Sequence, residues 1–349
     1  MKKPHNLLEA MNDLDEEIIQ DALSAPVITF KKRKLLRVLV AAALIAVLSL
    51  TAYAAHSLGL WYQNYFADHL HSEITSQQAT FLEEHVIPVE DIQPGITLES
   101  ALTDGVVIYM KLHVTGPDGV TLLPWDEGRN RGFAGNDHIN FAVESEVDIV
   151  TMDGKKVYNG LRFIPVEDGD GKKNTIDYMA TGMLKGLWDL TGKTLDIRIR
   201  DFCQFTRDED FSNPKIEKIL SGEWNFEVPI TEKSLETREL LSEPVISSLR
   251  YLDMEAEEKT FRWKEDTPIT GITMRALSMD VLYQWGPMDP CGDLGEIAWA
   301  VMEDGSKVRL ITQYGGQGMV QYHAGSPIVL DNLDYVEFEN GLVVPAPES

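Results

Sequence analysis

The stretch 96-ITLESALTDGVVIYMKLHV-114 decides the fold class of this chain. It contains two strand-like runs, ITLESAL and VVIYMKLHV, on either side of Thr103-Asp104-Gly105. Strand-forming runs separated by an Asp-Gly turn are typical of a β-hairpin. The stretch therefore predicts two antiparallel strands and, with them, a mainly β fold.

Similar runs follow the hairpin and extend this prediction. The turn signals Pro117-Asp118-Gly119 and Met152-Asp153-Gly154 separate segments rich in β-branched and aromatic residues. Further candidate strands are INFAVESEVDIV, TLDIRIRDFCQF and GEWNFEVPI. This spacing of short strands and turns predicts an antiparallel, immunoglobulin-like β-sandwich over residues 91–231.

A second β unit is expected over residues 232–349. After Pro229 the charged stretch TEKSLETRELLSE shows no apolar alternation, which favours a domain boundary there. The runs that follow predict a second small sandwich, with Glu303-Asp304-Gly305-Ser306 as a hairpin turn. Its candidate strands are PITGITMRAL, MDVLYQW, EIAWAVME, KVRLITQY, LDYVEFEN and LVVPA.

An apolar stretch near the N-terminus predicts a transmembrane helix over residues 38–55. The sequence VLVAAALIAVLSLTAYAA contains no charged residue and is about as long as the hydrocarbon core of a bilayer. Five basic residues precede it (Lys31, Lys32, Arg33, Lys34 and Arg37), and the next basic residue is Lys111. This asymmetry predicts a cytoplasmic N-terminus and extracellular C-terminal domains. A helical juxtamembrane stalk is expected over residues 56–90, in which residues 57–87 form one or two short helices as a stalk or as a lid on the β region.

A cleaved signal peptide is the alternative interpretation of this stretch. Ala52-Tyr53-Ala54 fits the small-x-small pattern that precedes a cleavage site. Secretory signals, however, have a short basic region ahead of the apolar run, whereas 37 residues precede the run in this chain. We therefore favour the membrane span.

The cytoplasmic segment, residues 1–37, contains an amphipathic pattern over NLLEAMNDLDEEIIQDALS. Leu7, Met11, Leu14 and Ile18 recur at helical spacing, which predicts one apolar face. A short helix needs a partner for such a face. Its acidic residues, among them Asp13, Glu16 and Glu17, favour a basic cytoplasmic protein over the membrane surface. We predict that these seven residues form the partner-binding site.

The net charge excludes one class of function. The chain carries 56 acidic against 31 basic residues, a net charge of −25, and all of the acidic excess lies after residue 55. A region this acidic repels nucleic acid. We therefore expect no nucleic-acid binding by the β units.

No motif in the sequence indicates catalysis, a cofactor or a metal site. There is no HExxH motif, no CxxC pair and no nucleophile elbow, so we expect that the protein is not an enzyme. The turn VEDGDGKKNTID offers Asp168, Asp170 and Asp177, but Lys172 stands where a calcium loop requires an oxygen ligand. Two cysteines, Cys203 and Cys291, leave the presence of a disulfide open.

The order of these features resembles a family of membrane-bound anti-sigma-factor-like proteins of Gram-positive bacteria. The likeness lies in the LLEAMNDLDEEIIQDAL opening, the KKRK run, the single span, ITLESALTDGVVIYMKLHV and SGEWNFEVPI. The C-terminal EDGSKVRLI and LDNLDYVEFENGLVV resemble the β domain that often follows in those proteins. The outer domain of that family is of unknown function.

The resemblance implies that the N-terminal segment sequesters an extracytoplasmic-function sigma factor until an external signal, often through a regulatory protease, releases it. No cysteine precedes the span, so the zinc motif of many anti-sigma segments is absent and binding would be metal-free. The second interpretation is a membrane-anchored surface-binding or adhesion protein, and a third is a cell-wall enzyme. A sigma-factor gene directly upstream would favour the first.

Overall fold

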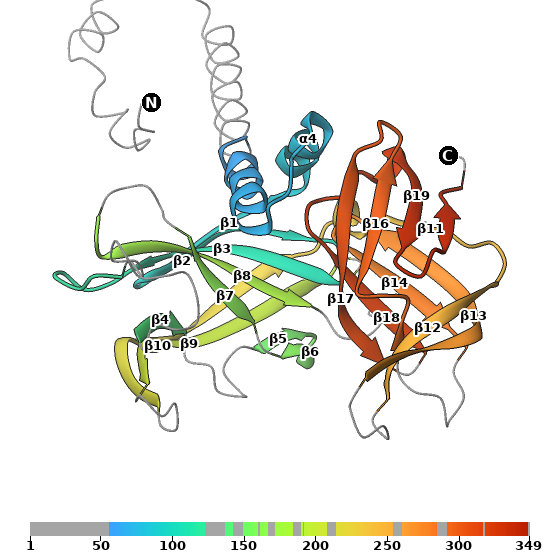
Figure 1. Cartoon of the computed structure of the whole chain (residues 1–349). Coiled ribbons are helices and arrows are strands. Elements are labelled where there is room, and N and C mark those ends of the chain that lie inside the picture. The colour runs from blue at the N-terminus through green and yellow to red at the C-terminus, as the bar shows by residue number, and fades with distance from the viewer. Residues whose placement is uncertain are drawn as a thin grey trace, which may run out of the picture. The chain divides into compact units, whose positions relative to one another are not determined.

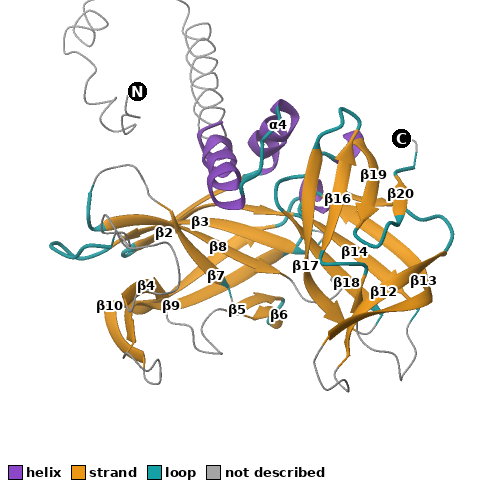
Figure 2. Cartoon of the chain, viewed as in Figure 1, coloured by secondary structure: helices purple, strands orange, loops and turns teal. Residues whose placement is uncertain are grey.

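A computed structural model describes most of the chain after residue 55 (Figure 1). The described residues are 56–122, 137–141, 149–159, 161–166, 172–183, 190, 192–207, 214–253, 260–284, 292–316 and 318–347. They are mainly β structure in antiparallel sheets, which confirms the predicted β-rich character (Figure 2).

The predicted hairpin forms the centre of the first sheet, sheet A. Its five strands lie in the order β1-β2-β3-β8-β7. They are β1 (Ile87–Gln93), β2 (Ile96–Thr103), β3 (Val107–Thr115), β8 (Thr175–Met183) and β7 (Arg162–Val166). The first strand thus begins before residue 91, where the sequence placed the start of the β region.

The turn between β2 and β3 depends on two residues of the predicted signal. Gly105 has φ +84°, and a Cβ atom there would lie 2.7 Å from the Leu235 side chain, so only glycine fits. One carboxylate oxygen of Asp104 accepts hydrogen bonds from the backbone N–H groups of Val106 at 2.9 Å and Val107 at 2.8 Å. This Asx-type turn fixes the hairpin.

A second sheet, sheet B, packs against one face of sheet A. Its order is β10-β9-β5-β6, with β4 also paired to β9. The strands are β4 (Asp137–Phe141), β5 (Ile149–Met152), β6 (Lys155–Asn159), β9 (Thr194–Arg207) and β10 (Pro214–Pro229). A common core joins Ile108, Met110 and Leu112 of β3 to Ile197 of β9 and Phe226 of β10.

Two helices cover the opposite face of sheet A. They span residues 56–70 and Ser76–His85 (α4), within the segment expected to form a stalk (Figure 1). Tyr62, Tyr65 and Phe66 of the first helix are buried with Leu82 of α4 and Tyr109 of β3. Sheet A is therefore buried on both sides, which explains its nearly continuous apolar strands.

The C-terminal half forms one continuous ten-stranded sheet, sheet C, around its own core. Its order is β15-β12-β13-β14-β18-β17-β16-β19-β20, with β11 also paired to β13. The strands are β11 (Thr237–Glu239), β12 (Val245–Asp253), β13 (Thr260–Arg275), β14 (Ser278–Tyr283), β15 (Gly292–Asp293), β16 (Ile297–Met302), β17 (Lys307–Gly316), β18 (Met319–Ala324), β19 (Leu333–Phe338) and β20 (Val343–Pro345). Two short 3-10 helices, η1 (Glu232–Leu235) and η2 (Leu330–Asn332), accompany them.

Two elements of this half differ from the sequence-based expectation. The charged stretch after Pro229 contains η1 and β11, which pairs with β13 through Thr237 and Arg275. The strand β12 was not predicted, because its alternation is interrupted by a register shift between Ser247 and Leu249. The expected strands thus join one sheet with these additions.

Candidate functional site

A group of polar side chains lies on the helix-covered face of sheet A. Successive strand residues point to opposite faces, so Ile108, Met110 and Leu112 enter the core shared with sheet B. Lys111 and His113 therefore point to the other face, together with Tyr109, which packs against the helices. Asp177 of β8 lies directly opposite His113 in the strand register.

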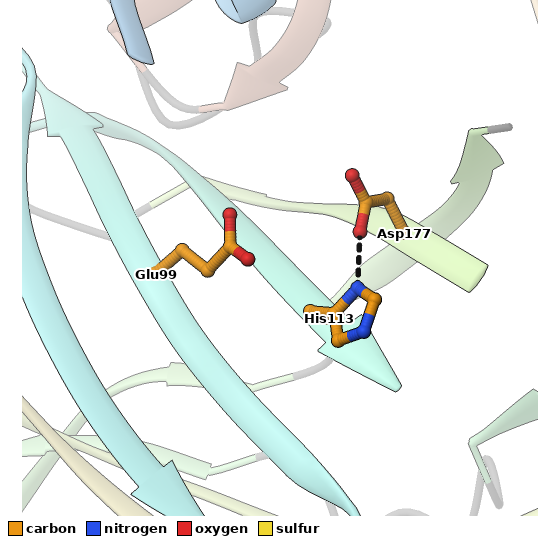
Figure 3. A group of neighbouring side chains, drawn as sticks. All are labelled: Glu99, His113 and Asp177. Carbon is orange, nitrogen blue, oxygen red and sulfur yellow. Dashed lines mark hydrogen bonds and ion pairs between the residues drawn. The ribbon is translucent and has the colours of Figure 1, made fainter. Parts of the chain in front are cut away.

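Lys111 is held between two carboxylates. Its Nζ lies 2.5 Å from Glu99 Oε2 and 3.1 Å from Asp177 Oδ2. His113 Nδ1 lies 2.8 Å from the other oxygen of Asp177 and donates a hydrogen bond to it (Figure 3). The side chain of Asp177 is only 4% exposed and that of Lys111 12%, so these contacts are poorly screened by solvent.

The same ammonium group contacts the first helix. Lys111 Nζ lies 4.9 Å from the centroid of the Trp61 ring, within the range of a cation–π interaction. Burial alone lowers the pKa of Lys111, but the carboxylates of Asp177 and Glu99 raise it above its usual value. Lys111 is therefore a permanent cation that joins the helix of residues 56–70 to sheet A.

Glu99, His113 and Asp177 also bring three possible metal ligands within 4.8 Å of one another. Both carboxylates, however, already bind the Lys111 ammonium group, and His113 Nδ1 is engaged with Asp177. A divalent ion would have to displace a buried lysine whose pKa is raised. The donor set therefore fits a lysine better than a metal, and the expected absence of a metal ion stays a prediction.

This group was not predicted from the sequence. Asp177 was expected only as a possible calcium ligand, whereas its two carboxylate oxygens contact Lys111 and His113. The charged residues Glu99, Lys111 and His113 inside otherwise apolar strands were the available signal. A lysine with a raised pKa is a poor nucleophile or base, so the arrangement favours a structural role over catalysis.

A second polar group joins sheet A to sheet C. The other carboxylate oxygen of Asp104 accepts hydrogen bonds from Ser278 Oγ at 2.6 Å and from the Leu277 backbone N–H at 3.0 Å. The Tyr109 hydroxyl contacts His323 Nε2. We call Asp104, Tyr109, Leu277, Ser278 and His323 the junction.

α4 and the segment between the two helices also form hydrogen bonds with the C-terminal half. Ser72 Oγ donates to the Gly325 carbonyl oxygen at 2.9 Å, and Gln78 Nε2 donates to the Pro327 carbonyl oxygen at 2.6 Å. Leu277 is fully buried in the cluster that contains Tyr62 and Phe66. The helices, sheet A and sheet C are therefore connected through buried contacts.

Protonation of His323 is expected to weaken the fold. Burial lowers the pKa of His323 to about 4, and the pKa of Tyr109 is raised well above its usual value by burial, so the tyrosine hydroxyl donates to a neutral ring. The unfolded chain binds this proton at about pH 6.5, so stability is complete above that pH and is lost as the pH falls towards 4. The loss is at most about 3 kcal/mol, the free energy that corresponds to a pKa of about 4 in the folded chain against about 6.5 in the unfolded one.

Urea unfolding of the full chain between pH 7 and pH 4 measures this loss. The variant His323→Gln should show a smaller dependence on pH than the wild type. The variant His71→Asn is the control, because His71 is exposed and its positive φ of 54° suits asparagine. An unchanged pH profile in His323→Gln would contradict the assignment.

The residues that the sequence analysis proposed as a partner-binding site lie outside the described residues. These are Leu7, Met11, Asp13, Leu14, Glu16, Glu17 and Ile18. The proposed span over residues 38–55 and Cys291 also lie outside them, whereas Cys203 is buried in β9. Among the residues that are described, no helix is long and apolar enough to cross a membrane.

Comparison with known proteins gives little further information. No protein-family model matches the chain, and no curated protein matches it. A solved structure, the conserved domain protein from Bacillus anthracis, has a TM-score of 0.36 and 10% identity over 72% of this chain and 76% of that one. A likeness this weak supports no conclusion about fold or function.

Proposed function

We propose that the chain is a single-pass membrane regulator that sequesters a sigma factor at its cytoplasmic N-terminus. In this proposal residues 38–55 span the bilayer, and the acidic, immunoglobulin-like β units over 91–231 and 232–349 lie outside. An external signal, acting with or without a protease, would change how the N-terminal segment presents its helix. The sequence features of residues 1–55 support the proposal.

The packing of the helix of residues 56–70 also supports the proposal. The helix of residues 56–70, which follows the proposed span directly in the chain, is part of the folded region. Its side chains Tyr62, Tyr65 and Phe66 are at most 2% exposed, and Trp61 packs against Lys111. A change in the β region can therefore reach the segment next to the span through rigid contacts, as a receptor requires.

The proposal predicts that the apolar face of the N-terminal helix binds the sigma factor. Burial of a Leu or Ile side chain is worth about 1.5 to 3 kcal/mol, so Leu14→Asp combined with Ile18→Asp should weaken binding at least about 100-fold. The measurement is a pull-down of cytoplasmic proteins with residues 1–34, followed by titration of the recovered protein. Neutral variants at Asp13, Glu16 and Glu17 should mainly slow association and reduce its salt dependence.

The control is a variant on the opposite face of the same helix, Gln20→Ala, which should bind like the wild type. Recovery of the same proteins by the wild type and the double aspartate variant would contradict the proposal. So would unchanged transcription in cells that lack residues 1–37. These results do not depend on how the β units fold.

A membrane-anchored adhesion protein is the second candidate, and one observation favours it. The hairpin of β12 and β13 exposes Phe261 and Ile246 to 60% each and Trp263 to 41%. Exposed aromatic side chains on a hairpin are common at binding surfaces. The test is the attachment of cells to a surface. Attachment that persists after deletion of residues 1–37 but is lost after deletion of residues 56–349 would favour adhesion over regulation.

A further inference from the structure

A pocket of about 470 Å³ lies between α4 and residues of the C-terminal half. Its walls come from α4, the end of β2, and the segment around η2. Its volume falls within the range of about 300–1,000 Å³ that is usual for small-molecule sites. We call it the α4 pocket.

One wall of the α4 pocket is apolar and aromatic. The Phe81 and His85 rings stack with centroids 3.8 Å apart and an interplanar angle of 12°. His85 Nδ1 donates a hydrogen bond to the Phe81 carbonyl oxygen at 2.8 Å, so the neutral ring carries its free lone pair on Nε2. Val329 and Leu330 add partly buried apolar surface.

The rim of the α4 pocket is acidic. Glu84, Glu236 and Asp331 contribute carboxylates from three separate segments, and no Lys or Arg lines the described part of the pocket. Arg238 is the described cation beside this lining, since its guanidinium donates to the carbonyl oxygen of the lining residue Leu330 at 2.7 Å and also to that of Pro347, against three carboxylates. The pocket thus favours cations and repels anions.

Neutral polar groups complete the lining. Ser76 and Gln77 are exposed in the first turn of α4, and Asn332 at the end of η2 is partly buried. Hydroxyl and amide groups pair with the hydroxyl groups of a ligand as both donors and acceptors. An aromatic face beside such groups suits the apolar face of a sugar ring.

We propose that the α4 pocket binds a protonated amine carried on a small polyhydroxylated body, the chemistry of an amino sugar. The carboxylates of Glu236 and Asp331 bind the ammonium group, Gln77 and Asn332 bind hydroxyl groups, and Phe81 packs against the ring. A neutral sugar lacks the charge, and an aliphatic polyamine lacks the hydroxyl groups. The inference is independent of the proposed sigma-factor function.

The test is isothermal titration of the full chain, purified in a mild detergent, with glucosamine as the probe. Glucosamine should bind at least tenfold more tightly than N-acetylglucosamine, whose nitrogen is uncharged. The double variant Glu236→Gln, Asp331→Asn should bind glucosamine at least tenfold more weakly. The variant Glu337→Gln is the control, because Glu337 lies outside the pocket in an exposed ion pair with Lys307, and it should bind like the wild type.

Four results would overturn the proposal. The first three are equal affinity for glucosamine and N-acetylglucosamine, unchanged affinity in the double variant, and absence of glucosamine binding. The fourth is tighter binding of spermidine than of glucosamine, since that would show a site for bare cations. A thermal unfolding curve of the double variant that matches the wild type ensures that lost binding reflects the pocket and not unfolding.

Discussion

Replacement of Asp104 by alanine is expected to lower the free energy of unfolding by about 5 kcal/mol. The side chain is only 2% exposed, and its carboxylate accepts four hydrogen bonds. Hydrogen bonds to a charged group are each worth about 1.5 to 3 kcal/mol, and buried donors left without a partner add a desolvation cost. Urea unfolding of the full chain, followed by tryptophan fluorescence, measures the effect.

The chain contains a matched control for this variant. Asp304 also precedes a glycine with positive φ, Gly305, and accepts a hydrogen bond from the Ser306 backbone N–H at 2.9 Å, but it lies on the surface. Asp304→Ala should therefore lower the free energy of unfolding far less than Asp104→Ala does. Ser278→Ala removes one bond of the junction and should cost about 1 to 2 kcal/mol. If Asp104→Ala and Asp304→Ala lowered the free energy of unfolding equally, the contacts of Asp104 to Leu277 and Ser278 would contribute nothing to stability.

Asp104 has one role that could be predicted from the sequence and one that could not. Its first role, in the turn between β2 and β3, follows from the local Asp-Gly pattern, and the predicted hairpin is confirmed. Its second role, as acceptor from Leu277 and Ser278, joins residues more than 170 positions apart. No local pattern specifies that pairing, because it depends on how two completed sheets pack.

The same limit applies to the polar group around Lys111. Strand alternation places Lys111 and His113 on one face of β3, but only the register with β8 brings Asp177 opposite them. Helices over residues 57–87 were predicted as a stalk or a lid, but the side chains that pack them on sheet A were not predicted. Tyr62 and Phe66 are buried because part of the helix-covered face of sheet A is also apolar, through Tyr109 and its neighbours, which a periodicity analysis of one segment does not reveal.

Loss of Lys111, which pairs with Glu99 and Asp177, is expected to have the second large effect on the free energy of unfolding. Lys111→Met should lower the free energy of unfolding by about 4 kcal/mol, because the buried Asp177 carboxylate loses its lysine partner and, among the described residues, only His113 still contacts it. The methionine also removes the cation from the Trp61 ring, so the first helix should detach more readily from sheet A. Urea unfolding measures the first effect, and hydrogen exchange of residues 56–70 measures the second.

Two further variants distinguish lost charge pairing from lost packing. Lys307→Met removes the lysine of an exposed ion pair with Glu337 and should cost less than about 1 kcal/mol. The triple variant Glu99→Gln, Lys111→Met, Asp177→Asn has no unpaired charge and should regain part of the stability that Lys111→Met loses. A triple variant no more stable than Lys111→Met would show that the lysine acts through packing alone. A thermal midpoint that rises in Zn²⁺ in the wild type but not in the triple variant would show instead that a metal ion competes with Lys111 for Glu99, His113 and Asp177, because only a ligand of the folded state stabilises it.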